Sequence, residues 1–155
     1  MNKPKLTDLL ISILTAELVG ALSGVVAGDI SGTYALLNKP PLSPPGWVFP
    51  VVWAVLYALM GISAYIVYNS NSSKKGCAFA LYTAQLILNF TWSIVFFRFQ
   101  AYGAAAAVLA ALIIAVVLMI VCFARIRPAA GIINIPYLLW LLFAAYLNIA
   151  TGLIN

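Results

Sequence analysis

The chain contains no histidine, only three acidic residues and only two cysteines. The lack of histidine excludes histidine-based catalytic triads, imidazole metal sites and axial histidine ligation of haem. No metal site is expected, and Cys77 and Cys122 are interpreted as small, reduced core residues. Charged residues make up 7% of the sequence and hydrophobic residues 65%, a composition unlike that of soluble domains.

Five apolar runs are each long enough to cross a bilayer, because hydrocarbon about 30 Å thick needs roughly 20 helical residues. They cover residues 6–27, 47–68, 77–97, 102–124 and 129–153 of the 155. A membrane β-barrel would show shorter segments with alternating polarity. The predicted fold is therefore an all-α integral membrane protein, with residues 1–155 forming one five-transmembrane-helix bundle.

The first apolar run has features of a secretory signal peptide, since Lys3 and Lys5 precede it and small residues end it. Its length and the presence of Glu17 favour a retained helix instead. An ionisable group inside a membrane is either functional or a structural carboxyl that faces the bundle, and both interpretations of Glu17 stay open.

Basic residues are distributed unevenly between the two ends of the predicted helices. Lys39 and Arg98 lie on one side of the membrane, and the other side holds Lys3, Lys5, Lys74, Lys75, Arg125 and Arg127. The positive-inside rule then predicts a cytoplasmic N-terminus and an outer C-terminus. Because the charges are spread over helix ends, no nucleic-acid partner is expected.

Residues 28–46 form a predicted loop on the outer face. Prolines fix φ and donate no backbone hydrogen bond, so the four prolines of this loop predict a stiff, extended cover. They are Pro40, Pro41, Pro44 and Pro45. Tyr34 and Leu37 either fold back over the bundle or anchor the loop among lipid headgroups.

Three helices carry aromatic and polar side chains on one face at about 100° per residue. These faces are predicted to point inward: Trp53, Tyr57, Met60, Ala64 and Tyr68; Tyr82, Gln85, Asn89, Trp92, Ser93 and Phe96; and Trp140, Ala144, Asn148 and Thr151 beyond a bend at Pro136. Gln85 and Asn89 either join helices or bind a ligand.

Two helices also carry small residues at four-residue spacing, which permits close helix packing. The first ridge, predicted to pack within the bundle, is Ala16, Gly20, Gly24 and Gly28. The second is Gly103, Ala107, Ala111 and Ala115, and it serves either packing within the bundle or a homodimer.

The inward faces predict an apolar cavity with a few hydrogen-bond donors, lined by Trp53, Tyr57, Asn89, Trp92 and Trp140. Such a cavity fits a flat hydrophobic molecule with a polar edge. The alternative is that the tryptophans belong to interfacial belts, an interpretation that suits Trp47.

The chain contains a set of motifs in order: Tyr34-x-x-Leu37-x-Lys39-Pro40, Pro44-Pro45-x-Trp47-Val48-Phe49-Pro50, Trp53-x-x-Leu56-Tyr57-x-x-Met60-Gly61, Asn89-x-x-Trp92 with Phe96-Phe97, Pro136-Tyr137-Leu138-x-Trp140 and Leu147-Asn148. Together these motifs resemble the tryptophan-rich sensory protein family, the bacterial branch of the translocator protein or peripheral-type benzodiazepine receptor. The resemblance implies a homodimeric five-helix bundle that binds protoporphyrin IX and benzodiazepine or isoquinoline compounds. It also implies light-dependent oxidative degradation of protoporphyrin, with Trp53 and Trp140 in the catalytic role.

Carried over by position, the implied ligand site is Tyr34, Pro44, Trp53, Tyr57, Asn89, Trp92, Trp140, Phe143 and Ala144. Protoporphyrin is then a ligand or substrate, and no resident cofactor is expected. Thr33 and Ser93 depart from the family pattern, which commonly has tryptophan and proline there. The residues after Asn148 lack the proposed cholesterol motif of animal members, so sterol binding is not expected.

Whether the chain is an enzyme stays open, because it offers no acid–base pair or activated nucleophile and the ligand itself would supply the chemistry. Two rival functions remain. One is a transporter of porphyrin or another small hydrophobic metabolite, and the other is a stress sensor whose bound ligand acts on a partner.

Overall fold

The computed structural model describes residues 5–155, and within them all regular structure is helical. The helices are α1 (Leu6–Ala27), α2 (Ile30–Leu36), α3 (Val48–Tyr68), α4 (Lys75–Ser93), α5 (Tyr102–Ile126), α6 (Pro128–Ile132) and α7 (Ile135–Ile154). A π-helical turn, η1 (Ile94–Arg98), continues α4. Among the described residues, five helical spans are long and apolar enough to cross a membrane, which confirms the predicted fold class.

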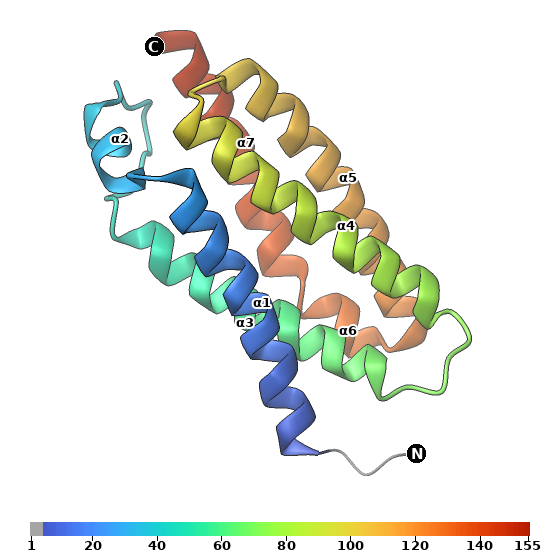
Figure 1. Cartoon of the computed structure of the whole chain (residues 1–155). Coiled ribbons are helices and arrows are strands. Elements are labelled where there is room, and N and C mark those ends of the chain that lie inside the picture. Colours follow the sequence, from blue (N-terminus) through green and yellow to red (C-terminus); the bar gives the residue numbers. More distant parts are fainter. Residues whose placement is uncertain (1–4) are drawn as a thin grey trace.

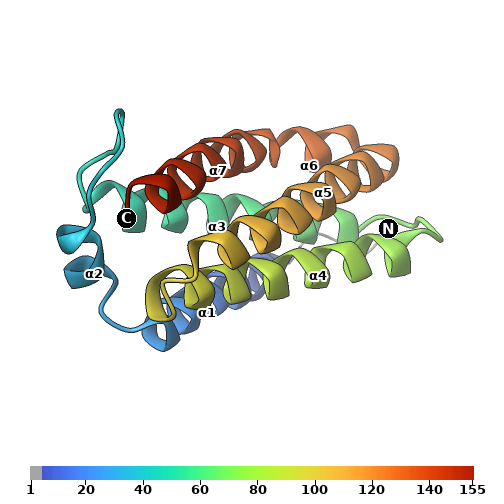
Figure 2. The ribbon, with the colours of Figure 1, turned by 90° about the horizontal axis from the view of Figure 1, so that it is seen from above.

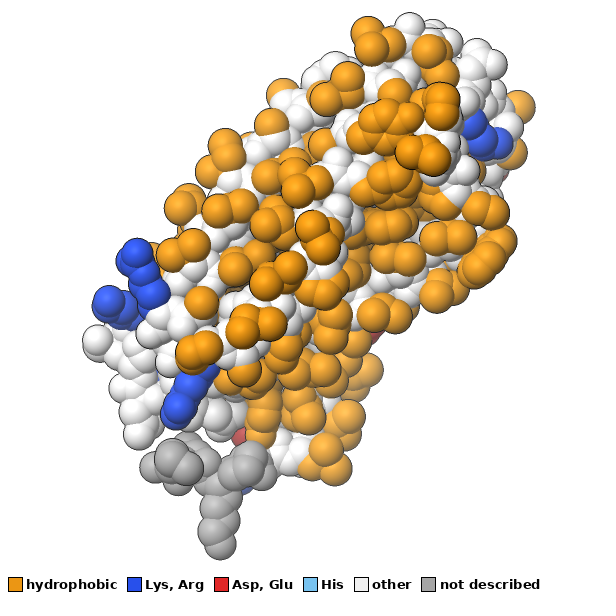
Figure 3. Space-filling model, turned by 180° about the vertical axis from the view of Figure 1, so that it is seen from behind, with side chains coloured by type: hydrophobic (Ala, Val, Ile, Leu, Met, Phe, Trp, Pro, Cys, Tyr) orange, Lys and Arg blue, Asp and Glu red, His pale blue; other side chains and the backbone are white. Residues whose placement is uncertain are grey.

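The spans run side by side, with α2 and the C-terminus at one end of the bundle and the α3–α4 connection at the other (Figures 1 and 2). Helix α1 packs mainly on α3, α4 on α5, and α5 on both α6 and α7. Hydrophobic side chains predominate on the surface drawn in Figure 3, and its Lys and Arg side chains lie towards the two ends. Such a surface is stable only in a bilayer, because it would expose a very large apolar area to water.

Helices α1 and α3 approach closely because Gly61 has no side chain. A Cβ atom at Gly61 would lie 2.5 Å from Cα of Ile13, a backbone atom that cannot move aside. The Ser12 hydroxyl donates a hydrogen bond to the Gly61 carbonyl oxygen at 2.8 Å across the same contact. Short contacts between small residues are the main attraction between helices in lipid, where no hydrophobic effect drives them together.

The predicted small ridge of α1 is confirmed only in its first half. Ala16 is fully buried, and Gly20 lies directly beneath the Tyr57 ring. Around Gly24 and Gly28 there is open space, so these two glycines pack against nothing within van der Waals range of a Cβ atom. The ridge on α5 turns outward: Ala107 and Ala111 are exposed, and only Ala115 is buried.

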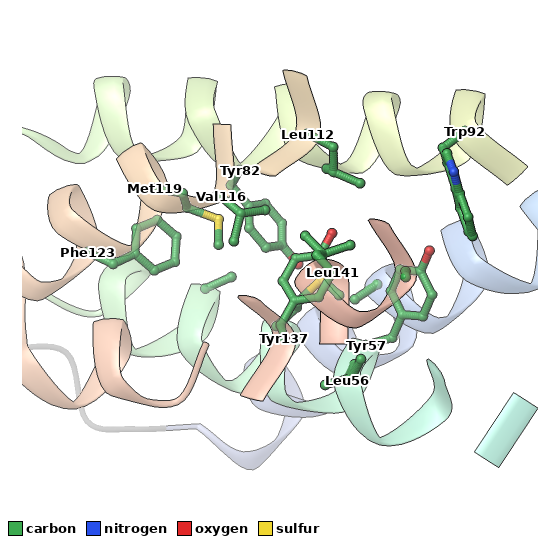
Figure 4. Packing of buried hydrophobic residues seen from close by; sticks show 14 of the residues in the cluster. Leu56, Tyr57, Tyr82, Trp92, Leu112, Val116, Met119, Phe123, Tyr137 and Leu141 are labelled. Carbon is green, nitrogen blue, oxygen red and sulfur yellow. The ribbon is translucent and has the colours of Figure 1, made fainter. Parts of the chain in front are cut away.

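The core runs along the bundle axis from the end near Phe123 to the end near Trp92 (Figure 4). At the Phe123 end the packing is apolar, with Met119 fully buried and Tyr82 stacked on Phe123 at a centroid distance of 6.2 Å. Towards Trp92, buried amides and phenols replace the aliphatic side chains. This second half of the core contains most of the predicted site residues.

The predicted loop 28–46 is not wholly extended, because it contains the short helix α2. Asp29 precedes this helix, and its carboxylate accepts a hydrogen bond from the Gly32 amide at 2.8 Å. An aspartate that receives an amide hydrogen bond from the first turn is a favourable helix N-cap. The stretch from Leu37 to Trp47 remains irregular, as the prolines predict.

The last span is broken before Pro136 rather than bent at it, which corrects the prediction of one helix over 129–153. Helix α6 ends at Ile132, and α7 starts at Ile135 with Pro136 in its first turn. In a first turn the amide hydrogen that proline lacks would have had no partner within the helix. At the break, Nδ2 of the Asn134 side chain donates a hydrogen bond to the Ala130 carbonyl oxygen at 2.8 Å.

Three further predictions about side chains are wrong. Cys77 is exposed and Cys122 is half-buried, so neither is a core residue. Tyr68, predicted on the inward face of its helix, is 59% exposed because it lies in the final turn of α3. Lys3, which contributes to the predicted orientation, lies outside the described residues.

Candidate functional site

A cover made of α2 and the proline-rich stretch, residues 30–47, lies over one end of the bundle (Figure 2). Tyr34 holds the two parts of the cover together, since its hydroxyl donates to the Pro44 carbonyl oxygen at 2.6 Å. Burial raises the pKa of the Tyr34 phenol, and a hydrogen bond with Ser43 partly opposes this rise. The phenol is therefore protonated at neutral pH and can donate this bond.

The cover is also attached to the ends of α3 and α7. The Tyr34 ring contacts Phe49 of α3 edge to face, with the ring centroids 5.0 Å apart. Asn155, just after α7, exchanges two hydrogen bonds with Asn38: its Oδ1 accepts from the Asn38 amide at 2.9 Å, and its Nδ2 donates to the Asn38 carbonyl oxygen at 3.0 Å. Tyr146 adds a bond to the Pro41 carbonyl oxygen at 2.8 Å. The structure thus shows the cover closed.

A buried hydrogen-bonded group joins α4 to α7 in the middle of the bundle. The Tyr137 hydroxyl donates to Oε1 of Gln85 at 2.8 Å and accepts from Nδ2 of Asn89 at 3.0 Å. Nε2 of Gln85 in turn faces the sulfur of Met60 on α3 at 3.6 Å. All four residues are at most 1% exposed, so the two amides do join helices, which was one of their two predicted roles.

Trp92 is fixed by a second buried hydrogen bond nearer the cover. Its indole Nε1 donates to Oδ1 of Asn148 at 3.0 Å, and Nδ2 of Asn148 donates to the Tyr102 carbonyl oxygen at 2.9 Å. The π-helical turn after Ser93 brings both Phe96 and Phe97 against the Trp92 ring, at centroid distances of 5.5 and 6.2 Å. Single π-helical turns within α-helices are frequent at functional sites.

Trp53 is the centre of the aromatic cluster. Its ring contacts Tyr57, Trp92 and Tyr137, at centroid distances of 5.7, 6.4 and 6.2 Å. Four predicted site residues, Trp53, Tyr57, Asn89 and Trp92, therefore meet in one region of the core. Together with Tyr137 they present aromatic faces beside amide and phenol groups, which is the combination of apolar and polar surface that the sequence predicts.

Trp140 and Phe143 do not join this cluster. The ring partners of Trp140 are Phe49 and Phe143, at 6.0 and 5.5 Å. Both side chains line an apolar groove of about 480 Å³ that opens on the side of the bundle between α3 and α7. The groove exists because α3 packs mainly on α1 and α7 mainly on α5, so these two spans diverge.

A much smaller cavity lies beneath the cover, with a volume of about 30 Å³. Three predicted site residues, Tyr34, Trp92 and Ala144, line this cavity together with Phe49 and Phe96. About one or two water molecules fill such a volume, whereas pockets for drug-sized ligands measure roughly 300–1,000 Å³. With the cover closed, a flat polycyclic molecule does not fit there.

Sequence reasoning missed Tyr137 as a central residue and missed the lateral groove. The signal for Tyr137 is present in the sequence, since Tyr137, Leu141, Ala144 and Asn148 recur at three- and four-residue spacing. No cluster of three or more metal-ligating His, Cys, Asp or Glu side chains occurs among residues 5–155.

Comparisons with known proteins agree with the motifs. The profile of the TspO/MBR family matches residues 12–154. The chain is 37% identical to the tryptophan-rich protein TspO of Archaeoglobus fulgidus, over 100% of this chain and 99% of that protein. It is 38% identical to the tryptophan-rich sensory protein of Cereibacter sphaeroides (79% of this chain, 76% of that one) and 36% identical to the human translocator protein (81% and 76%). The chain is an integral membrane protein and belongs to the TspO/MBR family.

Proposed function

We propose that this protein is a membrane receptor for tetrapyrroles, with protoporphyrin IX as ligand or substrate, and for flat benzodiazepine or isoquinoline compounds. The main support is the cluster in which Trp53, Tyr57 and Trp92 meet the buried amides next to Tyr137. Aromatic faces match a planar macrocycle, and the amides and phenols offer partners for its polar edge. Names such as sensory protein and translocator protein among the relatives agree with a receptor or sensor role.

Binding requires the cover to move, because the cavity beneath it measures only about 30 Å³. The hydrogen bonds that close the cover lie at its edge and are exposed or partly buried, so each contributes little to stability. The free energy needed to open the cover is therefore small relative to the free energy gained when a large aromatic ligand is buried. The receptor then selects ligands that are large and apolar enough to hold it open.

A light-dependent oxidation of bound protoporphyrin is the chemical part of the proposal. The porphyrin absorbs the light, and molecular oxygen is the oxidant that adds to the macrocycle, so the porphyrin itself supplies the electrons. The protein holds indole rings beside the macrocycle and fixes its orientation towards oxygen. Trp53 and Trp140 are the proposed residues in this role. The chain supplies orientation, while the reactive chemistry belongs to the ligand.

The test uses purified protein in detergent with protoporphyrin IX, illuminated and followed by the loss of its Soret band. We expect faster loss than for free porphyrin, and we expect Trp53→Phe and Trp140→Phe to reduce photoproduct per bound porphyrin more than they reduce equilibrium binding. Equal loss with and without protein would refute the oxidation. Absence of saturable binding would refute the receptor itself.

We also propose that the N-terminus is cytoplasmic and that the cover lies outside, in a bacterial cell membrane. Five of the eight basic residues lie in the described chain at the end away from the cover: Lys5, Lys74, Lys75, Arg125 and Arg127. Cys77 lies at the same end and is exposed. In inside-out vesicles Cys77 should react with a membrane-impermeant maleimide, with Cys77→Ser as the control; labelling only of right-side-out vesicles would reverse the orientation.

A further inference from the structure

The lateral groove between α3 and α7 is apolar on every side. Its floor is formed by Leu56, which is buried, and its rim includes Val51, Val55 and Leu139, which are 55%, 55% and 60% exposed. Rim and floor both belong to membrane-spanning helices. The exposed rim therefore faces the hydrocarbon of the bilayer, and a molecule dissolved there meets no polar barrier at the mouth.

The groove and the small cavity beneath the cover share a wall. Phe49 lines the cavity, Trp140 lines the groove, and their rings meet edge to face at a centroid distance of 6.0 Å. The next contacts on either side continue the row, with Tyr34 on Phe49 and Phe143 on Trp140. Two aromatic side chains therefore separate a space open to lipid from the space beneath the cover.

The two spaces differ in size, and only the groove is large enough to hold a ligand. The groove, at about 480 Å³, falls within the usual range for ligand pockets, whereas the cavity of about 30 Å³ does not. Side chains such as Phe49 and Trp140 can change rotamer without unfolding any helix, and rotamer changes are fast relative to the movement of a cover. Rotation of this pair would join the two spaces.

We propose that the α3–α7 groove is a lateral entry site, in which a flat apolar ligand arriving from the hydrocarbon core is held before it passes the Phe49–Trp140 pair. This inference rests on the proposed receptor function and adds the route by which the ligand reaches its site. The occupant is the same planar hydrophobic class, because the lining offers aromatic and aliphatic contacts and no charged or polar side chain. The cover then moves outward only to make room for the bound ligand, and the ligand does not enter through it.

The experiment follows the association of protoporphyrin IX with full-length protein in lipid nanodiscs, read from the shift of the porphyrin absorption band. Val55→Trp fills the groove mouth, and Val117→Trp places the same side chain on an exposed position of α5, away from the groove. We expect Val55→Trp to slow association and dissociation by the same factor, roughly fivefold, with the dissociation constant unchanged, and Val117→Trp to change neither rate. Phe49→Ala should accelerate both.

A second variant tests the cover directly. Asn155→Ala removes both bonds between Asn155 and Asn38 and loosens the cover without touching the groove. An unchanged association rate of protoporphyrin IX in Asn155→Ala supports lateral entry. If Asn155→Ala instead raises the association rate and Val55→Trp has no effect on it, lateral entry is overturned in favour of entry through the cover. Weaker equilibrium binding in Val55→Trp at an unchanged association rate would also overturn it, since the groove would then be the resting site. Failure of the wild-type protein to bind is a different result and refutes the receptor.

Discussion

Replacement of Tyr137 by phenylalanine tests the buried hydrogen bonds that hold α7 against α4. The change keeps the ring and therefore its edge contact with Trp53 at 6.2 Å, and it removes only the hydroxyl. The hydroxyl donates to Gln85 at 2.8 Å and accepts from Asn89 at 3.0 Å. Both amides are almost completely buried, so water cannot replace the lost partner.

The magnitude follows from the two bonds. Hydrogen bonds between helices in a membrane average about 0.6 kcal/mol and reach about 1.7 kcal/mol, so two of them are worth about 1.2 kcal/mol and at most about 3.4 kcal/mol. The expected loss in the free energy of unfolding is therefore about 1–3 kcal/mol. Tyr146→Phe is the matched control, since it removes one exposed bond to the Pro41 carbonyl oxygen and should cost less than about 0.5 kcal/mol.

The assay is reversible unfolding in mixed micelles, with a double-mutant cycle between Tyr137→Phe and Asn89→Leu. Residues that share a hydrogen bond show coupling of about 0.5 kcal/mol or more, whereas independent sites are additive. Additive free energies would mean that the Asn89 bond contributes nothing. A Tyr137→Phe protein within about 0.3 kcal/mol of wild type would refute the whole account of the buried group.

Two other predictions concern helix contacts. Gly61→Ala should destabilise the protein by about 1–3 kcal/mol in the same unfolding assay, because the new Cβ would lie 2.5 Å from the Ile13 backbone. In the control Gly76→Ala the new Cβ meets nothing within 4 Å, so this variant should be neutral or slightly stabilised. Equal effects of the two changes would contradict the close α1–α3 contact. We also expect a homodimer by light scattering in detergent, with Ala107→Leu/Ala111→Leu shifting the mass to that of a monomer, because these residues form an exposed small ridge on α5. A monomeric wild-type protein would contradict the dimer.

The sequence predicts the five spans well because lipid leaves few alternatives: an apolar run of about 20 residues must satisfy its backbone internally and so becomes a helix. It predicts the inward face of α4 for the same reason, since Gln85 and Asn89 must find partners away from lipid. Helix α2 was harder to predict, because Ser31, Gly32 and Thr33 are weak helix formers and the only signal is the cap at Asp29.

The sequence predicts Trp140 on an inward face with Ala144, Asn148 and Thr151 beyond a bend at Pro136, and this pattern does not indicate which neighbours its ring meets. On α7, Trp140 lies roughly 60° round the helix from the buried Tyr137, on the side that also carries Pro136 and Phe143. Its ring therefore lies at the edge of the buried stripe, where it packs against the core and also borders the groove. The volumes of the groove and the cavity depend on how α3, α7 and the cover diverge or close, and no local pattern in the sequence encodes such distances.

The different surroundings of Trp53 and Trp140 affect how their variants must be interpreted. Trp53 packs against three aromatic rings, including Tyr137 of the buried hydrogen-bonded group, and aromatic pairs contribute about 0.5–1.5 kcal/mol each. Trp140 borders an open groove and has two ring partners. Loss of photochemical turnover in Trp53→Phe can therefore arise from a loosened core, and it has meaning only after correction for the folded fraction. The same loss in Trp140→Phe reports directly on the contact with the ligand or on its entry, and the association rate distinguishes these two.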